Sequence, residues 1–238
     1  NEWILFLDAD EYIKESEINK LYDLLKIIDF HENKVQVLVL ERAETFAELV
    51  GELFAQISGE EGQFLLADQK EMDLDKCTEI VVNPFSFEIN NRKNLNKLYQ
   101  EMHMISQEEY FLSKSMLNTE TVRYLKDISQ KLPYAIQFVT DLNEVELFKI
   151  YDVKLEDKFS SLLEKLTEYL KILALLRNIR LVILVNLRDY LSSTQVKELY
   201  KTVFYYKINV LLVESSQKER LNCEDYHILD EQDCLIEF

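Results

Sequence analysis

The chain has 238 residues, of which 47% are hydrophobic and 30% are charged, a balance typical of a folded globular protein rather than a disordered one. Its longest apolar runs are about seven residues, so we expect no segment that spans a bilayer. The formal net charge of −17 argues against general nucleic-acid binding, because neutralising phosphates requires clustered Lys and Arg, but it allows a local basic surface and favours cation sites.

Glycine and cysteine usage narrow the possible functions further. Glycine occurs only at Gly51, Gly59 and Gly62, and the string GEEG lacks the Lys-Ser/Thr of a phosphate-binding loop. The three cysteines are isolated and lack metal-ligand spacing. Without a charged-then-apolar signal sequence, they indicate reduced thiols in a cytoplasmic protein. No serine lies in an elbow motif and the three histidines are in unrelated contexts, so no catalytic triad is predicted.

The N-terminal string NEWILFLD predicts a short buried strand that ends in an acidic cluster containing Asp8 and Asp10. The string WILFLDADE resembles the strand and acidic motif of family-2 glycosyltransferases, whose paired carboxylates could hold a divalent cation against a sugar-nucleotide diphosphate. An ordinary strand end, or a foreign segment joined to a different gene, is the alternative interpretation. We therefore treat residues 1–27 as an atypical N-terminal extension.

The next segments alternate between strands and a helix, and a helical arm then follows. Buried strands are predicted at Val35–Glu41, at QFLLAD and at Thr78–Pro84, with a one-faced helix over Ala43–Ile57 between the first two. Residues 91–132 contain no strand-like run and have helical spacing. This pattern predicts two or three helices, joined near Ser113 to Asn118, that form a protruding arm.

The best-specified core lies between Phe159 and Ser215. A helical stripe over 159–173 is followed by the unbroken apolar run Ile179–Val185, which predicts a strand covered on both faces. Ser192 and Gln195 fit a capping box that begins a second helix, and Ile208–Val213 is a second buried strand. Helix and strand alternating through short connections predicts an α/β fold built on a mainly parallel sheet.

Two sets of side chains are candidate binding residues. The basic residues Lys70 and Lys76, and the group Arg92, Lys93 and Lys97 at the foot of the arm, could contact phosphates, although each set could equally be a solvated face. Asparagines interleave with the second group. Polar residues also follow the predicted strands, at Glu41, Asn186 and Glu214, where ligands of open α/β sheets bind. Without a glycine loop, these three are better interpreted as structural.

An acidic loop supplies the candidate metal ligands. Asp141, Asn143, Glu144 and Glu146 place four oxygen-bearing side chains close together in the sequence, as hard cations such as Ca²⁺ require. The loop lacks the EF-hand pattern, and a solvated loop followed by a helix start is the alternative.

Several strings together resemble one known family. They are ENKVQVLVLERAETFAELVGEL, NPFSFEINNRKNLNKLYQEM, LEKLTEYLKILALLRNIRLVILVNLRDYLSSTQVKELYK, KINVLLVESSQKE and YHILDEQDC. From about residue 28 to the C-terminus, the chain resembles the Csn-two family, the CRISPR-associated spacer-adaptation protein specific to type II-A systems. The motifs are ordered apolar and polar strings rather than a catalytic signature.

The resemblance implies an α/β head, similar to P-loop folds but without a working phosphate loop, into which an all-helical leg is inserted. On this basis we expect the head at 28–92 and 150–238 and the leg at 93–149. The family implies a homotetrameric ring, with Ca²⁺ near acidic loops, that threads double-stranded DNA ends through a lysine-lined hole. It acts with the CRISPR integrase complex and the RNA-guided effector nuclease during spacer acquisition.

The sequence therefore predicts a protein that is not an enzyme and that binds DNA ends through the phosphate backbone, with no membrane partner. A ring would concentrate the few basic side chains on one inner surface while the acidic exterior stays in solvent. The alternatives are a glycosyltransferase fragment that uses Asp8 and Asp10, and an α/β scaffold that binds only protein.

Overall fold

The computed structural model describes residues 3–7, 28–68, 70–232 and 235–237. The chain divides into two compact units, which we describe separately. Unit 1 contains residues 1–87 and 159–238, and unit 2 contains residues 88–158.

Unit 2 has wider bounds than the predicted leg of 93–149, because segments on either side of its helices bond to each other. The side chain of Asn90 donates to the Leu155 carbonyl and accepts from the Leu155 backbone N–H, both at 2.9 Å.

The core of unit 1 is a six-stranded sheet with the order β10-β9-β3-β8-β7-β6. Five of these strands are mutually parallel, and only β10 is antiparallel to its neighbour. The prediction of an α/β fold with a mainly parallel sheet and an inserted helical segment is therefore confirmed. The strands are β3 (Val35–Leu40), β6 (Thr78–Val81), β7 (Leu181–Val185), β8 (Asn209–Glu214), β9 (Glu224–Leu229) and β10 (Leu235–Glu237).

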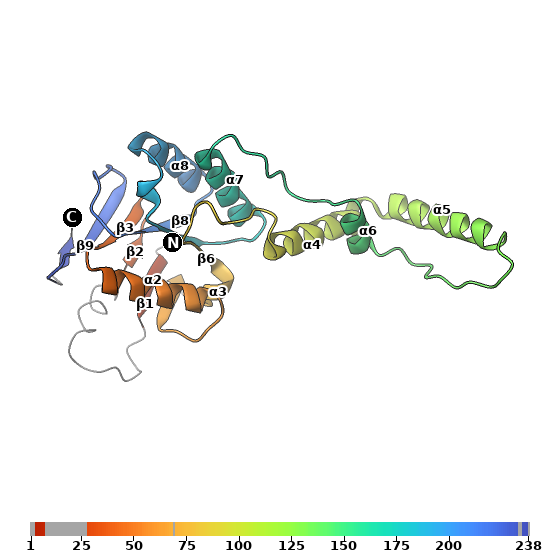
Figure 1. The fold of residues 1–238 in the computed structure, drawn as a ribbon, viewed down its shortest axis with the longest axis horizontal. Helices are drawn as coiled ribbons and strands as arrows, with labels where there is room; N and C mark the ends of the chain where they lie inside the picture. The colour runs from red at the N-terminus through yellow and green to blue at the C-terminus, as the bar shows by residue number, and fades with distance from the viewer. Residues whose placement is uncertain (1–2, 8–27, 69, 233–234, 238) are drawn as a thin grey trace. The chain divides into compact units, whose positions relative to one another are not determined.

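Helices cover both faces of this sheet, which explains why its central strands β3, β7 and β8 are mostly apolar. On one face, α2 (Ala43–Ile57) packs Leu49 and Leu53 against Leu38, Ile183 and other strand residues in one buried cluster. Figure 1 shows α3 (Leu74–Cys77) on the same side as α2, and α7 (Leu162–Leu175) with α8 (Ser193–Tyr205) on the opposite side. A one-turn 3-10 helix, η1 (Leu187–Asp189), follows β7.

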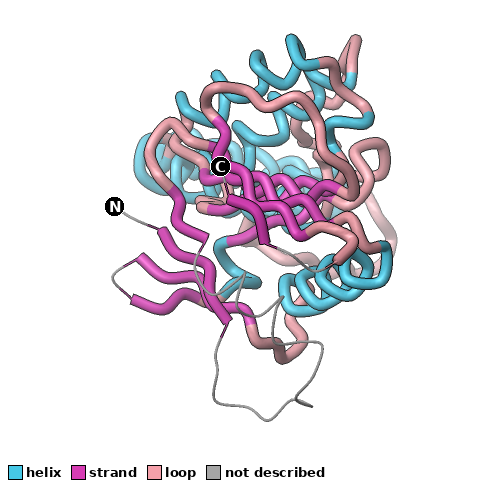
Figure 2. The backbone as a smooth tube through the Cα atoms, turned by 90° about the vertical axis from the view of Figure 1, so that its left-hand side faces the viewer, coloured by secondary structure: helices cyan, strands magenta, loops and turns pink. Residues whose placement is uncertain are grey.

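A second, antiparallel sheet in unit 1 has the order β2-β1-β4-β5, and Figure 2 shows it set apart from the larger sheet. Its strands are β1 (Trp3–Leu7), β2 (Ile28–Phe30), β4 (Phe64–Asp68) and β5 (Lys70–Met72). Strand β1 pairs with both β2 and β4, so the predicted boundary after residue 27 passes through a sheet rather than between domains. Asp8 and Asp10 lie outside the described residues.

Unit 2 consists of α4 (Arg92–Glu109), α5 (Phe111–Ser129) and α6 (Glu144–Ile150). The predicted junction near Ser113–Asn118 is wrong, because α5 is continuous there and the two long helices meet at Tyr110. No Gly or Pro interrupts 111–129 to end the helix earlier. Every side chain of α5 is at least partly accessible to solvent. Of the helices that the structure describes, none is both long and apolar enough to cross a membrane.

The capping box of α8 provides a test of the fold. Gln195 N donates to Ser192 Oγ at 3.4 Å, and Ser192 N donates to Gln195 Oε1 at 3.0 Å. We expect Ser192→Ala to lower the free energy of unfolding by about 1 kcal/mol in chemical denaturation, because a helix donor loses its acceptor. Ser193→Ala, one residue inside the helix, is the matched control and should change it by less than about 0.5 kcal/mol. Equal effects of the two substitutions would contradict a role for the cap.

Candidate functional site

The start of α4 is built by the asparagines that interleave with the predicted basic residues. Asn91 caps the helix by accepting from Asn94 N at 3.0 Å, and its amide donates to the Glu88 carbonyl at 2.8 Å. Asn94 is fully buried and donates to the Ile89 carbonyl at 2.7 Å. The side chains of Asn91 and Asn94 therefore fix the start of the helix by bonding to its backbone.

The first two turns of α4 carry three exposed cations, with Arg92 and Lys93 in the first turn and Lys97 in the second. Among the residues that the structure describes, no carboxylate pairs with any of them, and the first turn of α4 contains no acidic residue. Cations are disfavoured at a helix N-terminus, which already carries partial positive charge, by typically 0.3–1 kcal/mol each (roughly, at low salt). The cluster, which we name the α4 cation cluster, therefore concentrates positive potential at one place on an acidic chain.

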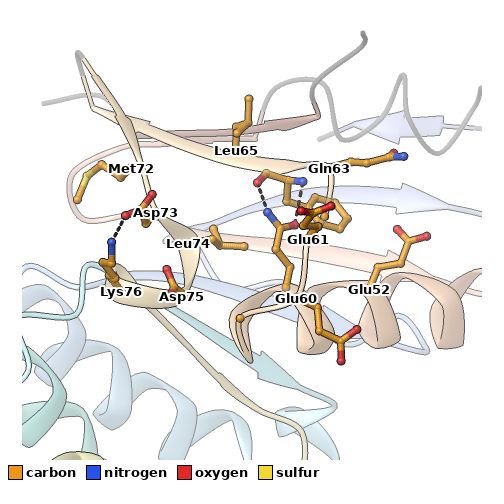
Figure 3. A pocket seen from close by; sticks show the side chains of 14 residues that line it. Glu52, Glu60, Glu61, Gln63, Leu65, Met72, Asp73, Leu74, Asp75 and Lys76 are labelled. Carbon is orange, nitrogen blue, oxygen red and sulfur yellow. Dashed lines mark hydrogen bonds and ion pairs between the residues drawn. The ribbon is translucent and has the colours of Figure 1, made fainter. Parts of the chain in front are cut away.

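Lys76, predicted to act with these residues, has a different environment. It lines a pocket of about 850 Å³ in unit 1 together with five carboxylates, Glu52, Glu60, Glu61, Asp73 and Asp75. Figure 3 shows its ammonium directed at Asp73, with which it forms an ion pair, and this hydrogen bond raises the pKa of Lys76. Asp73 and Asp75 beside Lys76, and the three glutamates elsewhere in the pocket, would repel phosphate, so we do not group Lys76 with the α4 cation cluster. The side chain of Lys70 lies outside the described part of the structure.

Of the four predicted metal ligands, Glu144 is the one that is buried, with 6% of its surface exposed. Its Oε2 lies 2.8 Å from Lys114 Nζ, 2.8 Å from His103 Nδ1 and 3.0 Å from Gln107 Nε2, and its Oε1 accepts from Ser106 Oγ. Burial alone raises the pKa of Glu144, but hydrogen bonds from Lys114 and Ser106 and the charges of Lys114 and His103 outweigh it, so the pKa lies below its ordinary value.

The other three predicted ligands, Asp141, Asn143 and Glu146, line a separate groove of about 220 Å³. This groove is formed by α5, α6 and the loop that connects them. Asn143 uses its side-chain oxygen to cap α6 by accepting from Glu146 N at 3.2 Å, and Glu146 pairs with Lys149 at 2.7 Å. The rest of the groove is largely aliphatic. Within the described ranges, no three His, Cys, Asp or Glu side chains are placed to hold a metal ion together. The predicted calcium ligands are therefore divided between two places and do not fit one calcium site.

Polar residues at the carboxyl ends of the parallel strands bond to neighbouring loops of the same unit. Glu41 and Arg42 alone connect β3 to α2, too few to wrap a phosphate. Asn186, with a left-handed backbone (φ 47°), accepts from Ser215 N at 2.8 Å, and Glu41 accepts from Gln217 at 3.1 Å. These contacts join neighbouring loops, which supports the structural interpretation of the strand-end residues.

Sequence reasoning missed a buried ion pair between Arg188 of η1 and Glu224 at the start of β9. Their charged atoms lie 3.3 Å apart, with side chains 3% and 0% exposed. Tyr200 donates to Glu224 Oε1 at 2.5 Å, and Arg188 donates to the Tyr226 hydroxyl at 2.5 Å. Burial raises the pKa of Tyr226 to about 12. No local pattern signals this pair, because its members are far apart in the sequence and each looks like a surface residue.

Glu214, at the end of β8, is buried with 1% exposed. Its Oε1 accepts from Arg188 N at 3.2 Å, and its Oε2 has no partner among the described residues. Burial raises its pKa to about 7. The folded protein therefore binds this proton more tightly than the unfolded chain does, and folding stability falls as the pH rises from about 4.5 to 7.

We expect Glu214→Gln to remove the loss of folding stability that the titration of Glu214 causes as the pH rises from about 4.5 to 7. Measured by chemical denaturation, the stability of the variant relative to the unsubstituted protein should rise between pH 4.5 and pH 7 by an amount on the order of 3 kcal/mol. The control Glu198→Gln, at an exposed position on α8, should follow the unsubstituted protein at every pH. Parallel pH profiles for Glu214→Gln and the unsubstituted protein would show that Glu214 does not titrate in this range.

Comparisons with known proteins agree with the sequence resemblance. A model of the family described as CRISPR-associated protein (Cas_Csn2) matches residues 56–233. The CRISPR-associated protein Csn2 of Enterococcus faecalis is 27% identical over 189 residues, which cover 76% of this chain and 83% of that protein.

Solved structures give a weaker comparison. The chain is similar to a bacterial Atm1-family ABC exporter with ATP bound (10% identity, TM-score 0.41), covering 96% of this chain but only 37% of that one. It is also similar to a putative ABC transporter ATP-binding protein from Pyrococcus furiosus (9% identity, TM-score 0.40), covering 95% of this chain and 97% of that one. These scores are low, so the fold assignment rests on the strand pairings. Because the family match spans well over half of the sequence, the chain belongs to the Cas_Csn2 family of CRISPR-associated proteins.

Proposed function

We propose that this protein binds double-stranded DNA ends without sequence preference and without catalysis, as a homotetrameric ring in the bacterial cytoplasm. In this role it serves spacer acquisition in type II-A CRISPR defence, together with the integrase complex and the RNA-guided effector nuclease. Family membership supports the role in adaptation. The observation that carries the DNA-binding part is the α4 cation cluster, three exposed cations with no described carboxylate partner.

The chemistry of this cluster suits contacts to the DNA backbone. Lys93 and Lys97 lie one helical turn apart and so share a face of α4. Phosphates attract such cations whatever the base sequence, and each phosphate neutralised releases counterions. One cluster of three cations is a weak site on a chain with a net charge of −17. Symmetric repetition in a ring would multiply it, which makes self-association part of the proposed mechanism.

Unit 2 also exposes apolar surface of the kind that self-association buries. Large apolar side chains are exposed at intervals between Met104 and Tyr151, and monomeric proteins rarely expose so much apolar surface. A second copy of this chain is the occupant that we propose, because the same surface would then be buried on both partners. The exposed residues are Met104, Ile105, Tyr110, Phe111, Leu112, Met116, Leu117, Tyr124, Ile128, Leu132, Tyr134, Ile136, Val139, Ile150 and Tyr151.

Two expectations from the sequence, glycosyltransferase activity and a calcium site, are not carried forward. Asp8 and Asp10, on which a glycosyltransferase would depend, lie outside both the described residues and the family match. Calcium is implied by the resemblance, but the four expected ligands do not form one site, so no step of the proposal uses it.

The DNA-binding proposal predicts a distinctive salt dependence. The logarithm of affinity for linear DNA should fall linearly with log salt, by about 0.9 per neutralised phosphate. A tetramer repeats each residue, so Lys97→Ala should reduce this slope by more than the roughly one unit expected for a single contact. Lys201→Ala is the matched control, because Lys201 is exposed on unit 1 and paired with Glu198 at 2.7 Å. Gel shifts at several salt concentrations measure the slopes, after light scattering has confirmed an intact oligomer.

The same experiment distinguishes threading from surface binding. A closed DNA circle has no end to enter a ring, so it should bind poorly under conditions in which linear DNA of the same sequence binds well. Equal affinity for circular and linear DNA by an intact oligomer would reject binding through ends.

The self-association proposal predicts that charge on unit 2 dissociates the assembly. Leu112 and Met116 are 76% and 69% exposed and lie one turn apart on α5. We expect Leu112→Asp combined with Met116→Asp to lower the mass measured by light scattering toward that of one chain. Burying two carboxylates in an apolar interface would cost several kcal/mol per ion, as an order of magnitude. Tyr205→Asp, at a 78% exposed site on α8, should leave the mass unchanged.

A further inference from the structure

The contacts of Glu144 join all three helices of unit 2. Glu144 is the first residue of α6, His103, Ser106 and Gln107 belong to α4, and Lys114 belongs to α5. The junction at Tyr110 makes this possible, because Ser106 lies one turn before it and Lys114 one turn after it. The ends of α4 and α5 thus converge on one carboxylate, and we name these five side chains the Glu144 clamp.

A carboxylate that is 6% exposed requires a compensating charge and a donor for each oxygen. The clamp provides both. The ammonium of Lys114, itself only 24% exposed, contacts Oε2, where His103 and Gln107 also lie within hydrogen-bond distance, and Ser106 donates to Oε1. The charge on Glu144 is therefore balanced from within the chain.

We propose that Lys114 acts as the internal counter-ion of Glu144, so that α6 is held on α4 and α5 without a divalent cation at this position. This assigns Lys114 a positioning role. The proposal concerns the fold of unit 2 and does not depend on the proposed DNA binding, so either can fail without the other.

The kinds of atoms around Glu144 favour the lysine over calcium. Calcium takes about six to eight oxygen ligands at about 2.3–2.6 Å. Here the neighbours are an ammonium, an imidazole, an amide and a hydroxyl, and the described residues place no second carboxylate beside Glu144. The two other predicted carboxylates, Asp141 and Glu146, line the separate groove. Calcium could reach Glu144 only by displacing Lys114, and it would gain a single carboxylate.

The test is thermal unfolding of the full chain, followed by circular dichroism with calcium or with EDTA. We expect the midpoint of the unsubstituted protein to be the same in both. Lys114→Gln should lower it by about 4–8 °C, because a buried carboxylate loses its counter-ion. Lys114→Arg, which keeps the charge, should recover most of the loss. Lys126→Gln, on the same helix but with no ion pair among the described residues, is the matched control and should shift the midpoint by less than about 2 °C.

Two further measurements keep the outcome decisive. Amide hydrogen exchange over 144–150 should quicken in Lys114→Gln and not in Lys126→Gln, which localises the effect even if the whole chain is weakened. Glu144→Gln added to Lys114→Gln should cost less than the two separate losses combined, because the pair acts as a unit. The proposal is overturned if EDTA lowers the midpoint of the unsubstituted protein and calcium restores it, or if Lys114→Gln behaves like Lys126→Gln in both measurements.

Discussion

Burial of both faces of the parallel sheet is the constraint on which the rest of unit 1 depends. Strands β3, β7 and β8 are buried along nearly their whole length, and their side chains are apolar except for Gln36, Asn209 and Glu214. The buried charged residues of unit 1 lie at the ends of elements, where Arg188 pairs with Glu224 and one oxygen of Glu214 accepts from the Arg188 backbone N–H. The polar residues at the strand ends, Glu41 and Asn186, bond to neighbouring loops. Residues that could contact a partner therefore lie on the surface of the protein.

Charge is distributed unevenly between the surfaces of the two units. The pocket of unit 1 that contains Lys76 is also lined by five carboxylates, whereas unit 2 places Arg92, Lys93 and Lys97 in the first two turns of α4, whose first turn contains no acidic residue. The same unit exposes most of the large apolar side chains that remain uncovered. Under the proposed function, both self-association and phosphate contacts would use residues of unit 2, which is inserted in the sequence of unit 1.

The parts that could be predicted from the sequence are those specified by neighbouring residues. The apolar run at β7, the helical stripe of α2 and the capping box at Ser192 are local patterns, and all three were correct. The contacts that could not be predicted have a partner that is distant in the chain. Ser106 and Glu144 are 38 residues apart, and Arg188 and Glu224 are 36 residues apart, so no short window of sequence contains both members of either pair. The pairing of β1 with β4 was likewise beyond any local pattern.

The short connection between β3 and α2 limits how this head could be engineered. Glu41 and Arg42 are its whole length, whereas a loop that encloses a phosphate needs about eight residues with two glycines and a lysine. Point substitutions leave the chain length unchanged, so none could create such a loop at this connection. An insertion would have to displace α2, whose Leu49 and Leu53 lie in one buried cluster with Leu38, so a new loop would come at the cost of the core.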